Sequence, residues 1–134
     1  MITAFDADVV IYAAFDDTRG RRIAALFDAD SAGVGSVLLL TEVLARPMRT
    51  DPDSAETKRL VGLLSRLDLR ALDSATARLA LALAVSYRLR AADAAHLATA
   101  VAAGADRFLT NNRRDFPRTI TEIDIAYPED LPTP

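Results

Sequence analysis

Acidic side chains at three separated positions are candidates for chemistry. Asp6 directly follows a short apolar run over residues 2–5, and Glu42 and Asp93 each stand where a helix is expected to begin. Carboxylates in first helical turns often only complement the helix dipole, which favours negative charge by about 0.3–1 kcal/mol. Asp6 differs, because a carboxylate at the end of a buried strand is unfavourable without a partner.

Convergence of these acids would create a cation site, because mutual repulsion raises carboxylate pKa values unless a cation neutralises the charge. Mg²⁺ and Mn²⁺ accept carboxylate and water ligands, lower the pKa of a bound water and stabilise the oxygens of a phosphodiester during displacement. The chain has no cysteine and a single histidine, which leaves oxygen ligands for any metal. The acids therefore indicate nucleic-acid hydrolysis.

Apolar runs and helical periodicities alternate along the chain. The pattern predicts strands over residues 2–5, 36–40, 69–72, 107–110 and 123–126. It predicts helices over residues 8–14, 18–28, 42–46, about 55–67, 74–89 and 91–103, with Thr41 capping the helix that starts at Glu42. Alternation of this kind is typical of an α/β fold with a parallel central sheet of about four to five strands flanked by helices.

Ligands of such sheets bind beyond the carboxyl ends of the strands, which is where Asp6, Glu42 and the turn after Thr110 are expected. With 134 residues the chain fits one domain over residues 1–134, and the Pro-rich residues 127–134 are expected to form an extended tail. The longest apolar run is too short to span a membrane, so we expect a cytoplasmic protein.

Charge gives only weak evidence about partners. The net charge is −3, which argues against bulk attraction to nucleic acid. Of the 16 cationic residues only Lys58 is lysine, and arginines cluster at residues 19–22 and 113–118. Arginine suits phosphate through its planar fork, although each cluster alone is also compatible with an ordinary solvated surface.

Four segments of the sequence carry a family resemblance: Phe5-Asp6-Ala7-Asp8-Val9-Val10, Leu40-Thr41-Glu42-Val43, Arg90-Ala91-Ala92-Asp93-Ala94-Ala95-His96-Leu97-Ala98-Thr99-Ala100 and Phe108-Leu109-Thr110-Asn111-Asn112-Arg113-Arg114-Asp115-Phe116. They resemble the PIN-domain family and, within it, VapC-like toxin ribonucleases, and the resemblance spans nearly the whole chain. It implies a single PIN-like domain and an endoribonuclease that depends on Mg²⁺ or Mn²⁺.

The resemblance also implies roles for individual residues. The catalytic metal ligands would be Asp6, Glu42 and Asp93, with Asp115 as a fourth acid whose contact runs through water. Thr110 and Asn112 would support the site. Many relatives carry Asn or Ser where this chain has Asp8, and Asp where it has Asn112. Asp8 is either a further ligand or a helix cap, and its residue type favours the cap.

His96 stands three residues after Asp93, on the same helical face. A lone histidine is a weak candidate for catalysis, so we expect a hydrogen bond of structural kind. Arg113 and Arg114, or the cluster at residues 19–22, are expected to guide the RNA backbone. Similarity to VapC-like toxins further implies a homodimer and a small antitoxin protein that covers the acidic site with a basic side chain.

Two other functions compete with this interpretation. An Asp-x-Asp pair after an apolar strand, here Asp6 and Asp8, also opens the HAD-like phosphatases, but these need a later lysine, and Lys58 sits in a segment patterned for packing. A receiver domain built on Asp16 and Asp17 lacks the same lysine. A non-catalytic PIN-like interaction module, whose acids only cap helices, would show no effect of metal on melting.

Overall fold

The computed structural model describes residues 1–28 and 33–134, and within them five parallel strands form one sheet. The strand order is β3-β2-β1-β4-β5. The strands are β1 (Thr3–Phe5), β2 (Gly33–Ser36), β3 (Asp68–Arg70), β4 (Arg107–Leu109) and β5 (Asp124–Ala126). The expected α/β class with a parallel sheet of about five strands is confirmed.

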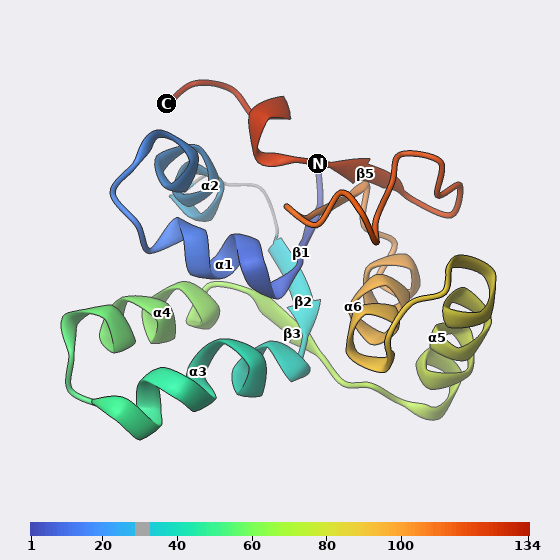
Figure 1. Cartoon of the computed structure of the whole chain (residues 1–134), viewed down its shortest axis with the longest axis horizontal. Helices are drawn as coiled ribbons and strands as arrows, with labels where there is room; N and C mark the ends of the chain where they lie inside the picture. The colour runs from blue at the N-terminus through green and yellow to red at the C-terminus, as the bar shows by residue number, and fades with distance from the viewer. Residues whose placement is uncertain (29–32) are drawn as a thin grey trace.

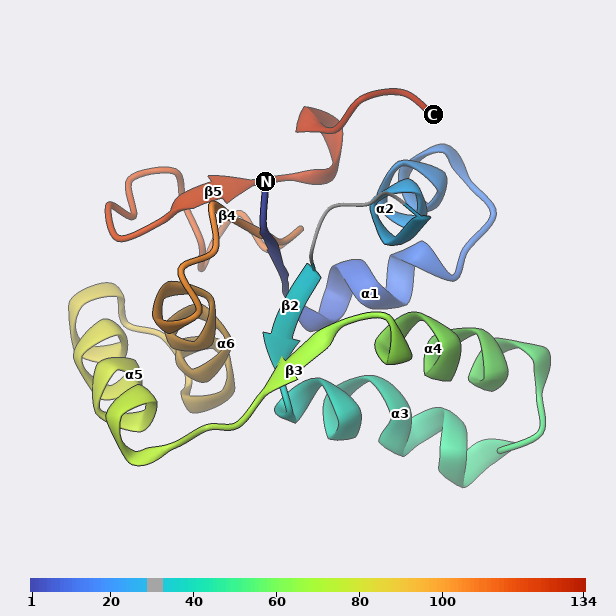
Figure 2. The same cartoon turned by 180° about the vertical axis from the view of Figure 1, so that it is seen from behind.

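Helices cover both faces of the sheet (Figures 1 and 2). They are α1 (Ala7–Ala13), α2 (Thr18–Asp28), α3 (Leu38–Thr50), α4 (Ala55–Ser65), α5 (Ser74–Tyr87) and α6 (Ala91–Ala102). The first four pack on one side around Phe5, Val9 and Leu39, and the last two pack on the other around Leu97 and Phe108. No helix in the described ranges has the length and apolar character needed to cross a membrane.

The strand predicted over residues 36–40 was placed too late in the chain. β2 ends at Ser36 and α3 begins at Leu38, so the apolar run that was expected to form a strand supplies the first turn of a helix and buries Leu39 completely. Thr41 is not the cap. The Ser36 hydroxyl instead accepts from the backbone N–H of Leu38 at 3.2 Å.

Two consequences follow for α3. Glu42 is the fifth residue of the helix rather than its first, so it does not complement the dipole from the first turn. The helix also continues through Pro47 to Thr50, whereas we expected it to end before this proline. A proline removes one backbone donor, and here the surrounding packing against α4 outweighs that loss.

The register places the candidate residues at one edge of the sheet. Thr3 pairs with Gly33 of β2 and with Arg107 of β4, so the carboxyl ends of these three strands lie together. Asp6 follows β1 and Thr110 follows β4. The expectation that these positions would meet beyond the strand ends is confirmed.

The C-terminal residues are not simply extended. Pro128–Asp130 form a 3₁₀ turn, and Tyr127 and Leu131 are buried. The Tyr127 hydroxyl donates to the backbone carbonyl of Phe116 at 2.8 Å, which ties this segment to the loop between β4 and β5. Burial of two apolar side chains explains why the Pro-rich composition did not give a free tail.

Candidate functional site

Asp6 is the anchor of the site. It is only 5% exposed, and it caps α1 because its Oδ1 accepts from the backbone N–H of Ala7 at 2.9 Å. Its Oδ2 accepts from the buried Thr110 hydroxyl at 2.7 Å. The predicted need of this carboxylate for a partner is thus met by β4, which lies next to β1 in the sheet. Asp6, and not Asp8, is the cap of the first helix.

Hydrogen bonds extend from Asp6 along the loop that follows β4. The Thr110 hydroxyl accepts from the backbone N–H of Asn112 at 3.0 Å, and the Asn112 side-chain amide donates to Asp115 Oδ2 at 2.9 Å. Asp8 joins the same loop, since its Oδ2 accepts from the backbone N–H of Asn111 at 3.1 Å. These contacts connect Thr110 and Asn112 to Asp6 and Asp115, and Asp8 to the same loop, while their role in supporting a metal site stays a prediction.

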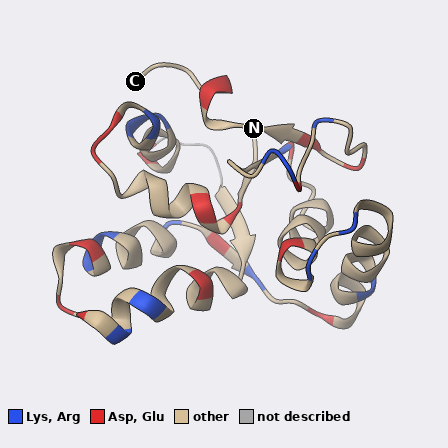
Figure 3. Ribbon diagram, viewed as in Figure 1, with Lys and Arg blue, Asp and Glu red and all other residues tan. Residues whose placement is uncertain are grey.

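The acids lie close enough to repel one another. Burial raises the pKa of Asp6, against the hydrogen bond from Thr110 that lowers it, and burial together with the negative charge of Asp6 raises the pKa of Asp8 to about 7. Burial also raises the pKa of Asp93, with further contributions from the charges of Asp6, Asp115 and Glu42. In Figure 3 the acidic segments of α1, α3, α6 and the β4–β5 loop gather around the centre of the molecule.

Glu42 reaches this group from α3 and meets His96 of α6. Glu42 Oε2 lies 3.1 Å from His96 Nε2, and the histidine side chain is fully buried whereas the glutamate side chain is 34% exposed. Neither ring nitrogen of His96 forms a hydrogen bond within the described ranges. The 3.1 Å contact with Glu42 is close enough for a hydrogen bond but is not aligned as one, so the structural hydrogen bond that we expected for His96 stays a prediction.

The acids match a divalent cation in chemistry, although their side chains do not enclose one. In residues 1–28 and 33–134 no three His, Asp or Glu side chains are grouped closely enough to hold a metal ion as placed. Two observations nevertheless fit a cation: burial, with a further contribution from neighbouring negative charges, raises the pKa values of Asp6, Asp8 and Asp93, and the buried Oδ1 of Asp8 has no hydrogen-bond partner in the described ranges. A cation would relieve both, and the half-exposed acids have room to rotate.

A groove on the α1–α3–α4 side is lined by Glu42 but by none of the other predicted acids. It has a volume of about 560 Å³ and is lined by Ile11, Phe15, Glu42, Val43, Arg46, Pro47, Thr50, Glu56 and Leu60. A larger hollow of about 800 Å³ lies beside β4 and β5 and contains none of the predicted acids. The groove beside Glu42 is therefore the one that bears on the site.

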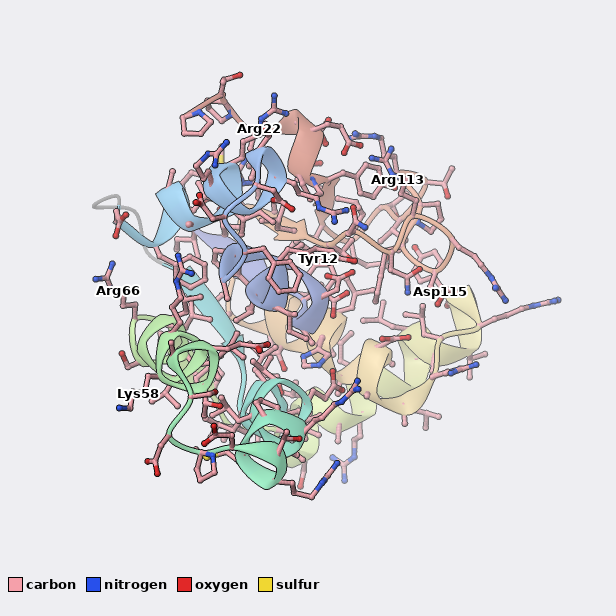
Figure 4. All side chains as sticks on the ribbon, turned by 60° about the vertical axis from the view of Figure 1, so that its left-hand side comes forward. Tyr12, Arg22, Lys58, Arg66, Arg113 and Asp115 are labelled. Atoms are coloured by element: carbon pink, nitrogen blue, oxygen red, sulfur yellow. The ribbon has the colours of Figure 1, made fainter. Side chains whose placement is uncertain are left out.

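The two arginines predicted to bind RNA differ in their surroundings. Arg113 stacks on the Tyr127 ring with its guanidinium carbon 4.5 Å from the ring centre, and it also pairs with Glu129. Arg114 is exposed. Figure 4 shows Arg113 and Asp115 on the same loop, on the opposite side of the molecule from Lys58. A lysine-dependent phosphatase built on this edge of the sheet is thus disfavoured.

Tyr127 was missed by the sequence analysis, and Arg118 was noted only as part of the arginine cluster at residues 113–118. Arg118 stacks on the same ring as Arg113, with its guanidinium carbon also 4.5 Å from the ring centre. Its Nη2 donates to both carboxylate oxygens of Asp130, at 2.8 Å to Oδ1 and 2.6 Å to Oδ2. These contacts hold the loop that carries Asp115. The Pro-rich C-terminal segment gave no local signal for them, because a stack between segments depends on tertiary packing.

Comparison with known families identifies the class of protein. Residues 4–120 match the family model described as PIN domain. That match covers most of the chain, so the protein belongs to the PIN domain family, as the sequence resemblance implied.

Three solved structures with a similar fold come from toxin–antitoxin complexes. A toxin–antitoxin complex from Klebsiella pneumoniae is similar at a TM-score of 0.76 and 22% identity, with 94% of this chain and 97% of that chain covered. VapBC2 from Rickettsia felis, bound to a DNA fragment from its promoter, gives 0.74 and 19%, covering 95% and 98%. DNA-bound VapBC from Salmonella typhimurium gives 0.67 and 18%, covering 96% and 98%. No curated protein sequence matches the chain.

Proposed function

We propose that the chain is a metal-dependent endoribonuclease that hydrolyses RNA phosphodiester bonds, and that it acts in the cytoplasm as the toxin of a VapBC-type pair. The observation that carries this proposal is the gathering of Asp6, Asp8, Glu42, Asp93 and Asp115 at the carboxyl edge of the sheet, where burial and neighbouring negative charges raise the pKa values of Asp6, Asp8 and Asp93. Membership of the PIN domain family and the toxin–antitoxin fold neighbours support the same function.

Asp6, Glu42, Asp93 and Asp115 would hold Mg²⁺ or Mn²⁺. When bound, such a cation supplies an activated water and neutralises charge on the phosphodiester. Asp6 is fixed for this role by Ala7 and Thr110, whose hydrogen bonds leave its carboxylate little freedom. The Asn112 amide orients Asp115 in the same way.

The chain's cations would position the RNA. Exposed Arg114 adjoins Asp115 and suits a phosphate, while Arg113 would have to leave Glu129 to contribute. RNA binding is therefore expected to weaken as salt rises, and Arg114→Ala to weaken it more than Arg113→Ala. Equal affinity at low and high salt would contradict this part.

Cleavage of a mixed panel of tRNA, rRNA fragments and single-stranded RNA with Mn²⁺ tests the proposal. We expect cleavage that disappears with a chelator and in Asp93→Asn, and that persists in Asp53→Asn, a matched change on the exposed loop before α4. Inactivity of the purified chain, combined with no rise in melting temperature on adding Mn²⁺, would instead favour a non-catalytic PIN-like interaction module.

An antitoxin is expected to cover the acids from the groove beside Glu42. Phe15 lines this groove and is 43% exposed, so an apolar segment of the antitoxin can pack there while a basic side chain reaches the carboxylates. Co-expression with the candidate antitoxin should abolish cleavage, and Phe15→Glu should restore it. Full inhibition of the Phe15→Glu variant would rule out this surface.

A homodimer is expected through α5. Leu81 and Val85 are 66% and 74% exposed and stand one helical turn apart, so they form an apolar stripe without cover in the monomer. Sedimentation should show a dimer for the natural chain and a monomer for the Leu81→Glu, Val85→Glu double variant. A variant that still dimerises would place the interface elsewhere.

A further inference from the structure

We propose that His96 is a positioning residue for Glu42: its imidazole donates from Nε2 to the glutamate carboxylate and holds that carboxylate toward Asp6 and Asp93. The inference rests on the proposed function, because it concerns one of the acids assigned to the cation. It assigns a role to the single histidine of the chain, which takes no part in the proposed binding of metal or RNA.

The first observation is the distance between the two groups. His96 Nε2 lies 3.1 Å from Glu42 Oε2, which is within the range of an N–H···O hydrogen bond. The imidazole comes from α6 and the carboxylate from α3, so the contact joins helices on opposite faces of the sheet. A hydrogen bond between these two atoms would fix the orientation of the Glu42 side chain. The backbone of Glu42 lies in α3, which follows the carboxyl end of β2.

The second observation is the burial of an unpaired ring. The His96 side chain is fully buried, and neither nitrogen forms a hydrogen bond in the described part of the chain. A buried donor without an acceptor is unfavourable, so the ring needs a partner. The Glu42 side chain is 34% exposed and can turn slightly to align with the Nε2–H.

The position of His96 on α6 explains why the contact bears on the acids. His96 stands three residues after Asp93, so both side chains lie on one face of the helix. The neighbouring Ala94, Ala95 and Ala98 are buried and small, which lets α6 approach the sheet closely. The imidazole thus contacts the Glu42 carboxylate from the same helix that carries Asp93, whose carboxylate is within range of the charges of Asp6 and Glu42.

A purely structural role makes a different prediction. If His96 only fills space, then any uncharged side chain of similar length should serve equally well. Gln and Met provide this comparison: each extends four bonds from Cα to its last heavy atom, as His does to Nε2, but only Gln ends in an N–H donor.

Calorimetric titration with Mn²⁺ separates the two roles. We expect His96→Met to weaken Mn²⁺ binding by about 10- to 100-fold, as is typical when a partner of a metal ligand is lost, and His96→Gln to stay within a few-fold of the natural chain. Melting curves in chelator check that both variants are folded. Equal Mn²⁺ affinity in the Met and Gln variants would overturn the inference.

Nitrogen NMR of the metal-free protein provides a readout that does not depend on the proposed nuclease function. At about pH 8, where free imidazole is neutral, we expect the Nε2–H tautomer in the natural chain and a changed Nε2 signal in Glu42→Met. An Nδ1–H tautomer, or signals unaffected by Glu42→Met, would overturn the inference. A natural chain that binds no Mn²⁺ but shows these NMR signals would contradict the proposed function while supporting the contact.

Discussion

Replacing Asp8 by Asn should change how the metal-free protein responds to pH. Burial and the charge of Asp6 raise the pKa of Asp8 from 3.8 to about 7. Between about pH 4 and pH 7, Asp8 is therefore mostly protonated in the folded chain and mostly ionised in the unfolded chain. Stability linked to this proton is fully present below about pH 4 and is lost as the pH rises to about 7.

The size of the effect follows from the shift. A difference of about three pKa units corresponds to about 4 kcal/mol at 1.36 kcal/mol per unit. Solvent screening of the partly exposed carboxylate reduces this to about 2 kcal/mol. Asn at position 8 carries no charge and keeps an oxygen that accepts the backbone N–H of Asn111, which Asp8 binds at 3.1 Å. The variant should thus gain about 2 kcal/mol over the natural chain at pH 7 and little at pH 4.

Urea denaturation at half-unit steps from pH 4 to pH 8, in the presence of chelator, measures this difference. Asp8→Ala is the control, and it should lose the pH dependence in the same way as Asp8→Asn. Its free energy of unfolding should be about 1 kcal/mol below that of Asp8→Asn at every pH, because alanine cannot accept the hydrogen bond from the Asn111 N–H. If the free energy gap between Asp8→Asn and the natural chain is the same at pH 4 and pH 7, the assigned charge repulsion is refuted.

Three further changes test the site and the packing. Asp93→Asn should abolish RNA cleavage while the metal-free melting temperature stays the same or rises, because like-charge repulsion is removed; a clear fall in melting temperature would indicate a capping role instead. Thr110→Val should lower the free energy of unfolding by about 1–3 kcal/mol in urea, because the buried Asp6 loses a hydrogen bond, and Thr110→Ser should lower it less. Gly20→Ala should destabilise the protein by about 1–3 kcal/mol, because the added Cβ would lie 2.1 Å from a backbone carbonyl oxygen. Gly62→Ala, which has open space around it, should stabilise the protein by about 0.5–1 kcal/mol. Equal melting temperatures of the two variants would contradict the packing.

Local patterns predicted most elements but misplaced β2 and both ends of α3. The helices predicted over residues 18–28 and 74–89 correspond to α2 and to α5, which starts at Ser74 and ends at Tyr87. The apolar run after Ser36 was assigned to a strand because a short apolar run fits a buried strand and a buried helix equally well. Contacts with α1 and α4 decide for the helix, and these are not visible in the local sequence.

For the site, the sequence by itself determined which residues are acidic, the alternation that makes a parallel sheet, and hence the edge of the sheet at which Asp6 and Thr110 meet. Strand direction is enough for that inference, because parallel strands end on one side. Only the tertiary structure decided that Asp6 caps α1, that His96 faces Glu42 and that Tyr127 holds the Asp115 loop. Each of the last two contacts depends on side-chain packing between separate segments, and that packing is set by the whole core rather than by neighbours in the chain.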